Sequence, residues 1–250
     1  MKTVDVHRIL GIDEQFKAPG RIMEILWDRG ERERVFREFL ECDPDLSFDG
    51  FHEYFEQEQA DRKVHKQDYT PDGVSRVLSR LAGLDGESYD PTAGTGGLLI
   101  VKWWRDCTSR LPFDYRPSEH LYWATELSDR AFPFLLFNLL IRGMNAVAIH
   151  GDVLEATARG VFLIQNDRDD ALAFSCLNLM PYDDQVLEFL GLRGWTGEPY
   201  PAHVESQWPP AALADMPPLD EIRAAGKRAR GDAEGVVAPP VALVQPGLFE

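Results

Sequence analysis

The 250-residue sequence lacks any apolar run of about 18 residues, the length that a membrane-spanning helix needs. Its first residues also lack the basic stretch followed by an apolar stretch that is typical of a secretory signal peptide. It has only three cysteines, Cys42, Cys107 and Cys176, which lie too far apart for a zinc site and fit a reducing compartment. These features predict a cytoplasmic protein with no membrane segment and no bound metal.

Basic residues are scarce as well. The sequence has 26 Lys and Arg against 42 Asp and Glu, which gives a formal net charge of −16. Such a chain should repel DNA phosphates unless its charges are segregated or a partner supplies cations. The net charge is −7 over residues 1–60, −1 over 61–160 and −8 over 161–250. Tight DNA binding by this chain alone is therefore disfavoured, although its middle third is nearly neutral.

What is present is enough apolar sequence to bury a core, since 44% of the residues are hydrophobic. Apolar residues recur at helical spacing among charges in residues 1–60, which predicts an N-terminal helical segment packed on the next domain. Residues 61–197 alternate strand-like and helix-like stretches, which predicts an α/β domain with a parallel, doubly wound, Rossmann-like sheet. Nine of the 17 prolines fall at or after Pro199, so residues 198–250 are predicted to be a proline-rich, flexible tail.

The four expected strands are ESYD at 87–90, HLYWATEL at 120–127, NAVAIHGD at 145–152 and AFSC at 173–176. A glycine-rich stretch, Asp90 to Gly97 (DPTAGTGG), separates the first strand from an apolar helix start. Glycines at such a turn allow the backbone to bend sharply and to approach a ligand closely, and the following helix offers free N–H groups. No Gly-Lys-Ser/Thr follows, so the stretch is not a phosphate-binding P-loop.

Two acidic residues stand at the ends of the next two strands. Glu126 ends the second strand, where a carboxylate can accept hydrogen bonds from both hydroxyls of a ribose. Asp152 ends the third strand and is placed to accept from an adenine amino group. Together with the glycine-rich turn, these acids predict a nucleoside site at the carboxyl edge of the sheet.

Four stretches in this order resemble N6-adenine DNA methyltransferases, above all the modification subunits of type I restriction systems and related phage-borne enzymes. They are QDYTPDGV (67–74), DPTAGTGGLL (90–99), TELSDRAFPFLLFNLLIRGMNAVAIHGD (125–152) and NLMPY (178–182). The resemblance implies a fold that binds S-adenosylmethionine (AdoMet). By motif, Tyr69, Thr70 and Pro71 would flank the methionine part, Asp90, Thr92, Gly94 and Gly96 would shape the main cradle, Glu126 would take the ribose and Asp152 the adenine.

The sequence departs from this family where catalysis is expected. The family has Asn/Asp-Pro-Pro-Tyr/Phe after the fourth strand, where the first side chain accepts from the target amine and the aromatic ring stacks on a flipped base. Here Leu179 occupies the amide position, Met180 the first proline, and Asn178 lies one residue early. The predicted catalytic residues are Asn178, Pro181 and Tyr182.

Three functions remain open on these residues. The first is an AdoMet-dependent N6-adenine DNA methyltransferase of bacterial or phage origin, in which Tyr182 stacks on the adenine. The second is a catalytically impaired AdoMet-binding accessory, regulatory or decoy module that acts through a protein partner. The third is a methyltransferase acting on RNA or protein. The intact glycine-rich turn favours an enzyme, whereas the acidic flanks favour a protein partner.

The expected partners follow from size and from the C-terminus. After residue 185 too little sequence remains for a DNA-reading domain, so a separate specificity subunit or another protein is expected, with DNA bound weakly by this chain alone. Gln245, Leu248 and Phe249 resemble the Gln-x-x-Leu-Phe peptides with which bacterial replication and repair proteins bind the sliding clamp. A tethered peptide of this kind would raise the local concentration of the protein on DNA without a basic surface.

Overall fold

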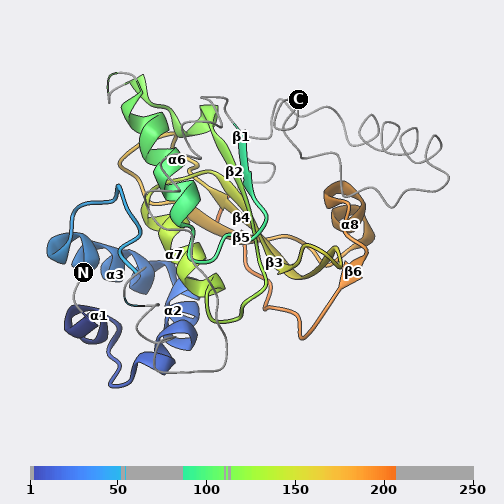
Figure 1. Cartoon of the computed structure of the whole chain (residues 1–250), viewed down its shortest axis with the longest axis horizontal. Coiled ribbons are helices and arrows are strands. Elements are labelled where there is room, and N and C mark those ends of the chain that lie inside the picture. Colours follow the sequence, from blue (N-terminus) through green and yellow to red (C-terminus); the bar gives the residue numbers. More distant parts are fainter. Residues whose placement is uncertain (1–2, 52–53, 55–86, 110, 112–113, 207–250) are drawn as a thin grey trace.

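The computed structural model of the chain describes residues 3–51, 54, 87–109, 111 and 114–206, which form a mixed α/β structure (Figure 1). The helices are α1 (Thr3–Leu10), α2 (Ala18–Trp27), α3 (Arg29–Cys42), α6 (Gly97–Thr108), α7 (Phe132–Ile141) and α8 (Asp184–Leu190), with short 3-10 turns at Gln15–Lys17 and Pro117–Glu119. The strands are β1 (Glu87–Asp90), β2 (Leu121–Glu126), β3 (Ala146–Asp152), β4 (Thr157–Gln165), β5 (Cys176–Leu179) and β6 (Gly194–Trp195).

The strands form one sheet in the order β1-β2-β3-β4-β5, with β6 paired to the start of β4. The pairs β1–β2 and β2–β3 are parallel, as we predicted for this part of the chain. Both faces of β2 are buried, so its side chains are apolar at nearly every position rather than at alternate ones. The carboxyl ends of β1, β2 and β3 therefore lie side by side at one edge.

The prediction of an all-parallel sheet is wrong at β4, which runs antiparallel to both β3 and β5. Only four residues connect Asp152 at the end of β3 to Thr157 at the start of β4. A connection this short permits a hairpin but no parallel crossover, which needs a dozen or more residues. The predicted fourth strand at 173–176 is also displaced, because β5 begins at Cys176.

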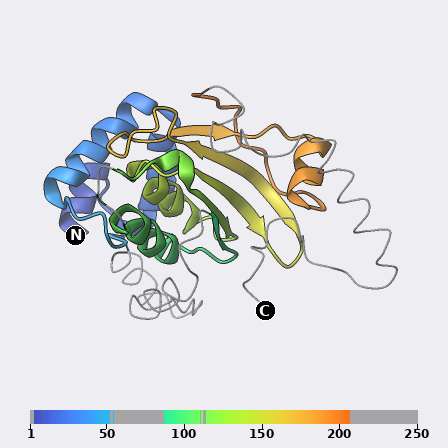
Figure 2. The ribbon, with the colours of Figure 1, turned by 90° about the horizontal axis from the view of Figure 1, so that it is seen from above.

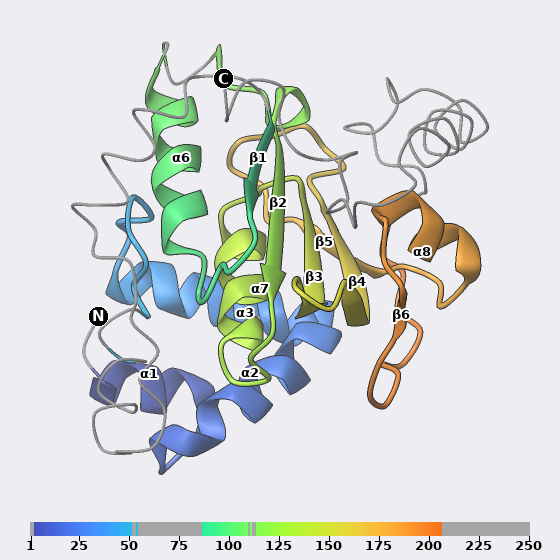
Figure 3. The ribbon, with the colours of Figure 1, turned by 45° about the vertical axis from the view of Figure 1, so that its right-hand side comes forward.

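The two faces of the sheet pack against different helices (Figures 2 and 3). On one face lie α6 and α7, with α2 packed on the far side of α7 and α1 and α3 beside it. All ten residues of α7 are buried, since this helix lies between the sheet and the N-terminal helices. On the other face, Val186 and Leu190 of α8 pack against the sheet residues that point that way.

The N-terminal helical segment is confirmed in the residues that the structure describes, with one break. The periodic stretch from Ile22 to Leu40 forms two helices, because Asp28 is extended and its carboxylate accepts a hydrogen bond from the Glu31 N–H at 3.0 Å. This is the usual geometry of an N-cap. Apolar side chains from Val6 onward share one core with α7 and the sheet, so α1–α3 belong to the same packed body as β1–β5.

The first part of the predicted flexible tail is bound to the domain. Residues 198–206 run back along β4 and β5, and we call this segment the strap. The Leu179 N–H donates to the His203 carbonyl at 2.7 Å, and Tyr200 packs against Phe162 in the core with ring centroids 5.1 Å apart. The strap is held by contacts with residues distant in the sequence, which its proline content does not reveal. Residues 207–250 lie outside the described part of the chain.

Candidate nucleoside site

The glycine-rich turn is a tightly wound loop between β1 and α6. Gly94 and Gly96 have φ values of +57° and +97°, which side-chain-bearing residues adopt only with strain. The Ala93 N–H donates to the Thr125 carbonyl at 2.9 Å, which holds the loop against the end of β2. A Cβ on Gly96 would lie 3.0 Å from the Leu135 side chain, so α7 approaches the loop closely. The motif therefore forms the narrow backbone turn that we predicted from its glycines.

Glu126 links the end of β2 to this turn. Its two carboxylate oxygens accept hydrogen bonds from the Gly94 and Ser128 N–H groups, each at 2.7 Å. The residue is buried, with 7% of its surface exposed. A carboxylate has about four acceptor positions, so roughly two are left for ligand hydroxyls. The predicted ribose acceptor thus lies beside the glycine-rich turn and retains the capacity for that role.

Asp90, at the end of β1, is a second buried carboxylate at the same edge. Burial raises its pKa, and the nearby negative charge of Glu126 raises it further, while the hydrogen bond from the Thr92 N–H at 3.1 Å acts in the opposite direction. Two acidic groups held close together away from water favour a ligand that brings positive charge. The loop end of β1 is therefore suited to a cationic group.

Asp152, the predicted adenine acceptor, lies at the end of β3 at the same sheet edge. One of its oxygens accepts from the N–H groups of Leu154 and Glu155, at 2.8 and 3.1 Å, which closes the turn into β4. Sequence reasoning missed two apolar neighbours of these acids, Leu127 and Leu154, which are 63% and 88% exposed. Leu127 directly follows Glu126 and Leu154 is two residues after Asp152, which was the available signal, and both give this edge an apolar surface.

The predicted catalytic residues lie elsewhere. Asn178 is inside β5 and Pro181 and Tyr182 follow it, whereas the glycine-rich turn follows β1 at the other end of the strand order. Neighbouring strands are about 4.8 Å apart, so four steps across the sheet separate the two by roughly 19 Å. The structure brings Asp90, Thr92, Gly94, Gly96, Glu126 and Asp152 to one edge. Asn178 lies in β5, four strand positions from β1, whereas the Tyr182 hydroxyl bonds to Arg159 at the start of β4, beside the end of β3 that carries Asp152.

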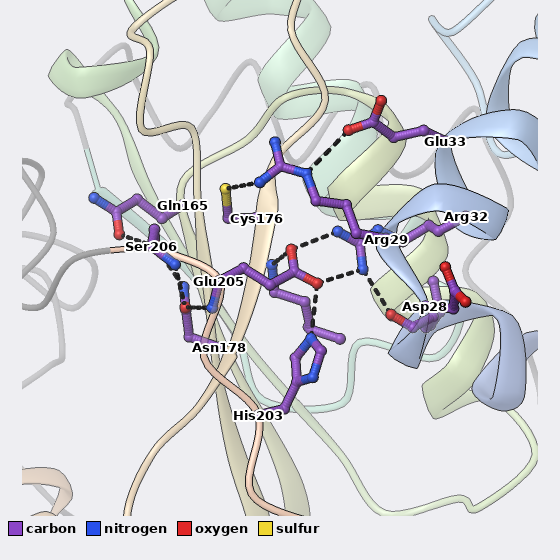
Figure 4. A network of polar contacts seen from close by, with 12 residues as sticks. Asp28, Arg29, Arg32, Glu33, Gln165, Cys176, Asn178, His203, Glu205 and Ser206 are labelled. Carbon is purple, nitrogen blue, oxygen red and sulfur yellow. Dashed lines mark hydrogen bonds and ion pairs between the residues drawn. The ribbon is translucent and has the colours of Figure 1, made fainter.

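Asn178 is 4% exposed, and its amide makes four hydrogen bonds; Figure 4 shows it beside Glu205 and Ser206. The nitrogen donates to the Leu163 carbonyl at 3.3 Å and to the Ser206 hydroxyl at 2.8 Å. The oxygen accepts from the N–H groups of Glu205 and Ser206 at 2.8 and 3.0 Å. Both donors and both lone pairs are used, so this amide has no free position for a substrate amine.

Tyr182 is also occupied by the surrounding protein. Its hydroxyl donates to the Arg159 carbonyl and accepts from the Tyr200 N–H, both at 2.9 Å. Its ring packs edge-on against Trp195, with centroids 4.7 Å apart. The neighbouring Asp183 caps α8 by accepting from the Val186 N–H at 2.9 Å. In this structure these side chains fasten the strap and α8 rather than line a pocket for a base.

The remaining predicted site residues, Tyr69, Thr70 and Pro71, and the clamp-peptide residues Gln245, Leu248 and Phe249 lie outside the described residues. The same holds for the domain boundary at residues 60 and 61. Among the residues that the structure describes, no cluster of three or more His, Cys, Asp or Glu could hold a metal ion. None of the described helices is long and apolar enough to cross a membrane.

A mostly parallel sheet with a glycine-rich turn after its first strand and acids after its next two is the arrangement of a methyltransferase-type α/β domain. The comparison with protein families agrees, because residues 45–168 match the model described as N-6 DNA Methylase. These residues, just under half of the chain, are similar to the N-6 DNA methylase family. The matched segment contains β1 to β4 and the whole candidate nucleoside site, and it ends before β5. A search among curated proteins returned no match to the sequence.

Proposed function

We propose that this chain is an AdoMet-binding module of an N6-adenine DNA methylation system and that it does not methylate adenine by itself. This is the second of the three functions that the sequence left open, and its main support is one observation. The glycine-rich turn follows β1, whereas the NLMPY sequence begins inside β5, four strand positions away. The similarity of residues 45–168 to the N-6 DNA methylase family supports the link to adenine methylation.

The fit of AdoMet to the site rests on the described residues. AdoMet carries a sulfonium and an ammonium group, which would offset the buried negative charges of Asp90 and Glu126. Its ribose hydroxyls would use the acceptor positions that Glu126 retains beside Gly94. The N-cap of α6 is Gly96, which has no side chain to cap the helix, so backbone N–H groups stay available to the carboxylate of the ligand. When bound, AdoMet supplies an electrophilic methyl group.

The same assignment orients the ligand along the sheet edge. With the methionine part at β1, the ribose at Glu126 and the adenine at Asp152, the methyl-bearing end lies on the side of the sheet away from β5. Methyl transfer needs the reacting atoms about 3–3.5 Å apart. The roughly 19 Å between β1 and β5 is too large for an adenine held at Asn178 to reach a methyl group at β1. The groups that hold the target adenine beside the methyl group therefore have to come from a partner, and a DNA-binding or specificity subunit is the class that we propose.

The second candidate is an autonomous adenine methyltransferase, which the similarity to this family favours. The two functions separate in one pair of experiments on the purified full-length chain. Calorimetry with AdoMet should show binding that Glu126→Gln weakens by tenfold or more and that Glu155→Gln, an exposed acid beyond β3, leaves unchanged. Labelled-methyl transfer to adenine-containing DNA should be at background level. No AdoMet binding contradicts the proposal, and transfer by the chain alone that Glu126→Gln abolishes identifies the autonomous enzyme.

Sliding-clamp binding is a separate proposal that concerns Gln245, Leu248 and Phe249. A glutamine followed by two adjacent apolar anchors suits a preformed pocket, and clamp binding would concentrate an acidic protein on DNA. Purified bacterial clamp should bind the full chain, and Leu248→Ala with Phe249→Ala should reduce that binding by tenfold or more. Equal binding by the wild type and the double variant would contradict it.

A further inference from the structure

The N-terminal segment contacts the glycine-rich turn through one buried side chain. Asp49, in the loop after α3, is 5% exposed. One of its carboxylate oxygens accepts a hydrogen bond from the Thr95 hydroxyl, and the other accepts from the Asn138 amide at 2.9 Å and from the Phe51 N–H at 3.0 Å. Asp49 therefore joins three parts of the chain, namely its own loop, α7 and the turn after β1.

Thr95 is held by hydrogen bonds at two of its groups, the side-chain hydroxyl and the backbone carbonyl. Besides the hydroxyl bond to Asp49, its carbonyl accepts from the Asn138 amide at 2.8 Å, and the residue is 2% exposed. It lies between Gly94 and Gly96, the two residues with positive φ. The turn therefore has one set of anchors at the end of β2 and a second set, at its centre, that depends on Asp49.

Arg142, at the end of α7, fixes the loop that carries Asp49. Its guanidinium donates to the carbonyls of Leu46 and Phe48 at 3.0 and 2.7 Å and to the Asn138 side chain at 2.8 Å. Burial lowers the pKa of Arg142 to about 10, while the charge of Asp49 raises it, and at neutral pH the group stays charged. A buried cation thus fixes the backbone on the N-terminal side of Asp49 and interacts with its charge.

We propose that Asp49 is a positioning residue for the AdoMet site, which holds the glycine-rich turn in its binding conformation through Thr95. The inference rests on the proposed function, since it assigns a role in AdoMet binding. Glycines give the turn its shape and also leave it free to adopt others. If loss of the Asp49–Thr95 bond leaves the binding conformation populated about one-tenth of the time, the apparent Kd for AdoMet rises about tenfold.

The test compares AdoMet affinity with thermal stability in the full-length chain. Asp49→Ala and Thr95→Val each remove the bond and should weaken AdoMet binding about tenfold by calorimetry. Asp49→Asn and Thr95→Ser keep a hydrogen-bonding pair at the same position and should stay within about threefold of the wild type. Asp45→Ala is the matched control, because this aspartate lies in the same loop, also interacts with the charge of Arg142, but is exposed and hydrogen-bonds to Ser47 instead of Thr95.

The expected signature is a rise in Kd without a matching fall in Tm. The conservative variants should restore affinity. The double variant Asp49→Ala/Thr95→Val should bind AdoMet no more weakly than either single variant. Thr95→Val decides the matter if Asp49→Ala fails to fold, since it leaves Asp49 and Arg142 in place. Wild-type affinity in folded Thr95→Val overturns the positioning role. Absence of AdoMet binding by the wild type is a different result, which contradicts the proposed function instead.

Discussion

The ion pair between Arg32 and Glu205 offers the sharpest test of how the strap is held. The Arg32 side chain is 1% exposed and that of Glu205 is 7% exposed. The guanidinium donates to the two carboxylate oxygens at 2.8 and 2.6 Å, in the two-pronged geometry that gives strong charge-assisted bonds. The same carboxylate accepts from the Leu177 N–H at 3.0 Å and from His203 at 2.7 Å. One side chain therefore connects α3, β5 and the strap (Figure 4).

Glu205→Gln would keep the shape of this side chain and remove its charge. The buried guanidinium of Arg32 would then face an amide that supplies one acceptor oxygen and presents N–H donors to the other donors around it. Removing one partner of a buried ion pair costs about 3–5 kcal/mol. In a domain of this size each kcal/mol lowers Tm by about 2–4 °C, so a drop of roughly 10 °C is expected.

The assay is denaturant and thermal unfolding of the full chain, with Glu38→Gln as the control. Glu38 pairs with Arg34 on the same helix, but both side chains are partly exposed, at 33% and 53%, and such a pair contributes about 0.3–0.5 kcal/mol. If Glu205→Gln costs less than about 1 kcal/mol, as expected for its exposed counterpart, the buried pair does not hold the strap and the reasoning is wrong.

The pH dependence of stability supplies a second check on Glu205. Burial raises its pKa, but the hydrogen bonds and charge of Arg32, with the Leu177 N–H and His203, outweigh burial and lower the pKa overall. Because the folded-state pKa lies below the unfolded one, this stabilisation is present above roughly pH 4.3 and is lost as the pH falls through the folded-state value. Glu205→Gln should remove that part of the acid sensitivity.

Three further predictions concern single side chains. Gly96→Ala should lower the free energy of unfolding by about 1–2 kcal/mol and weaken AdoMet binding, because the φ of Gly96 is +97°. Gly97→Ala, with open space around the added Cβ, should do neither. Equal effects of the two variants in calorimetry and unfolding would contradict this. Burial lowers the pKa of His150 from 6.5 to about 4, so stability should fall by up to about 3 kcal/mol between those pH values, and His150→Gln should flatten the decline; an unchanged slope would refute it. Tyr182→Phe should cost about 1–2 kcal/mol through its two backbone hydrogen bonds and leave AdoMet affinity intact; lost affinity in calorimetry would link Tyr182 to the nucleoside site after all.

Local sequence patterns determined the part of the fold in which each element carries its own signal. β1, β2 and β3 lie within the predicted stretches 87–90, 120–127 and 145–152, and the glycines of residues 90–97 form the expected turn. Burial on both faces selects continuous apolar strands, and left-handed backbone selects glycine. Because acids at the carboxyl ends of parallel neighbouring strands must share an edge, Glu126 and Asp152 were also predictable as neighbours of that turn.

Only the tertiary structure decided which residues meet across long distances in the sequence. Asp49 contacts Thr95 and Asn138, and Glu205 contacts Arg32, through hydrogen bonds between residues whose local sequence carries no periodic signal. The strand order puts β5 at the opposite end of the sheet from β1, so Asn178 is a buried anchor for the strap rather than a neighbour of the glycine-rich turn. A motif specifies a residue and its immediate backbone, but strand order specifies what lies beside it, and here that order places the NLMPY sequence four strand positions from the glycine-rich turn.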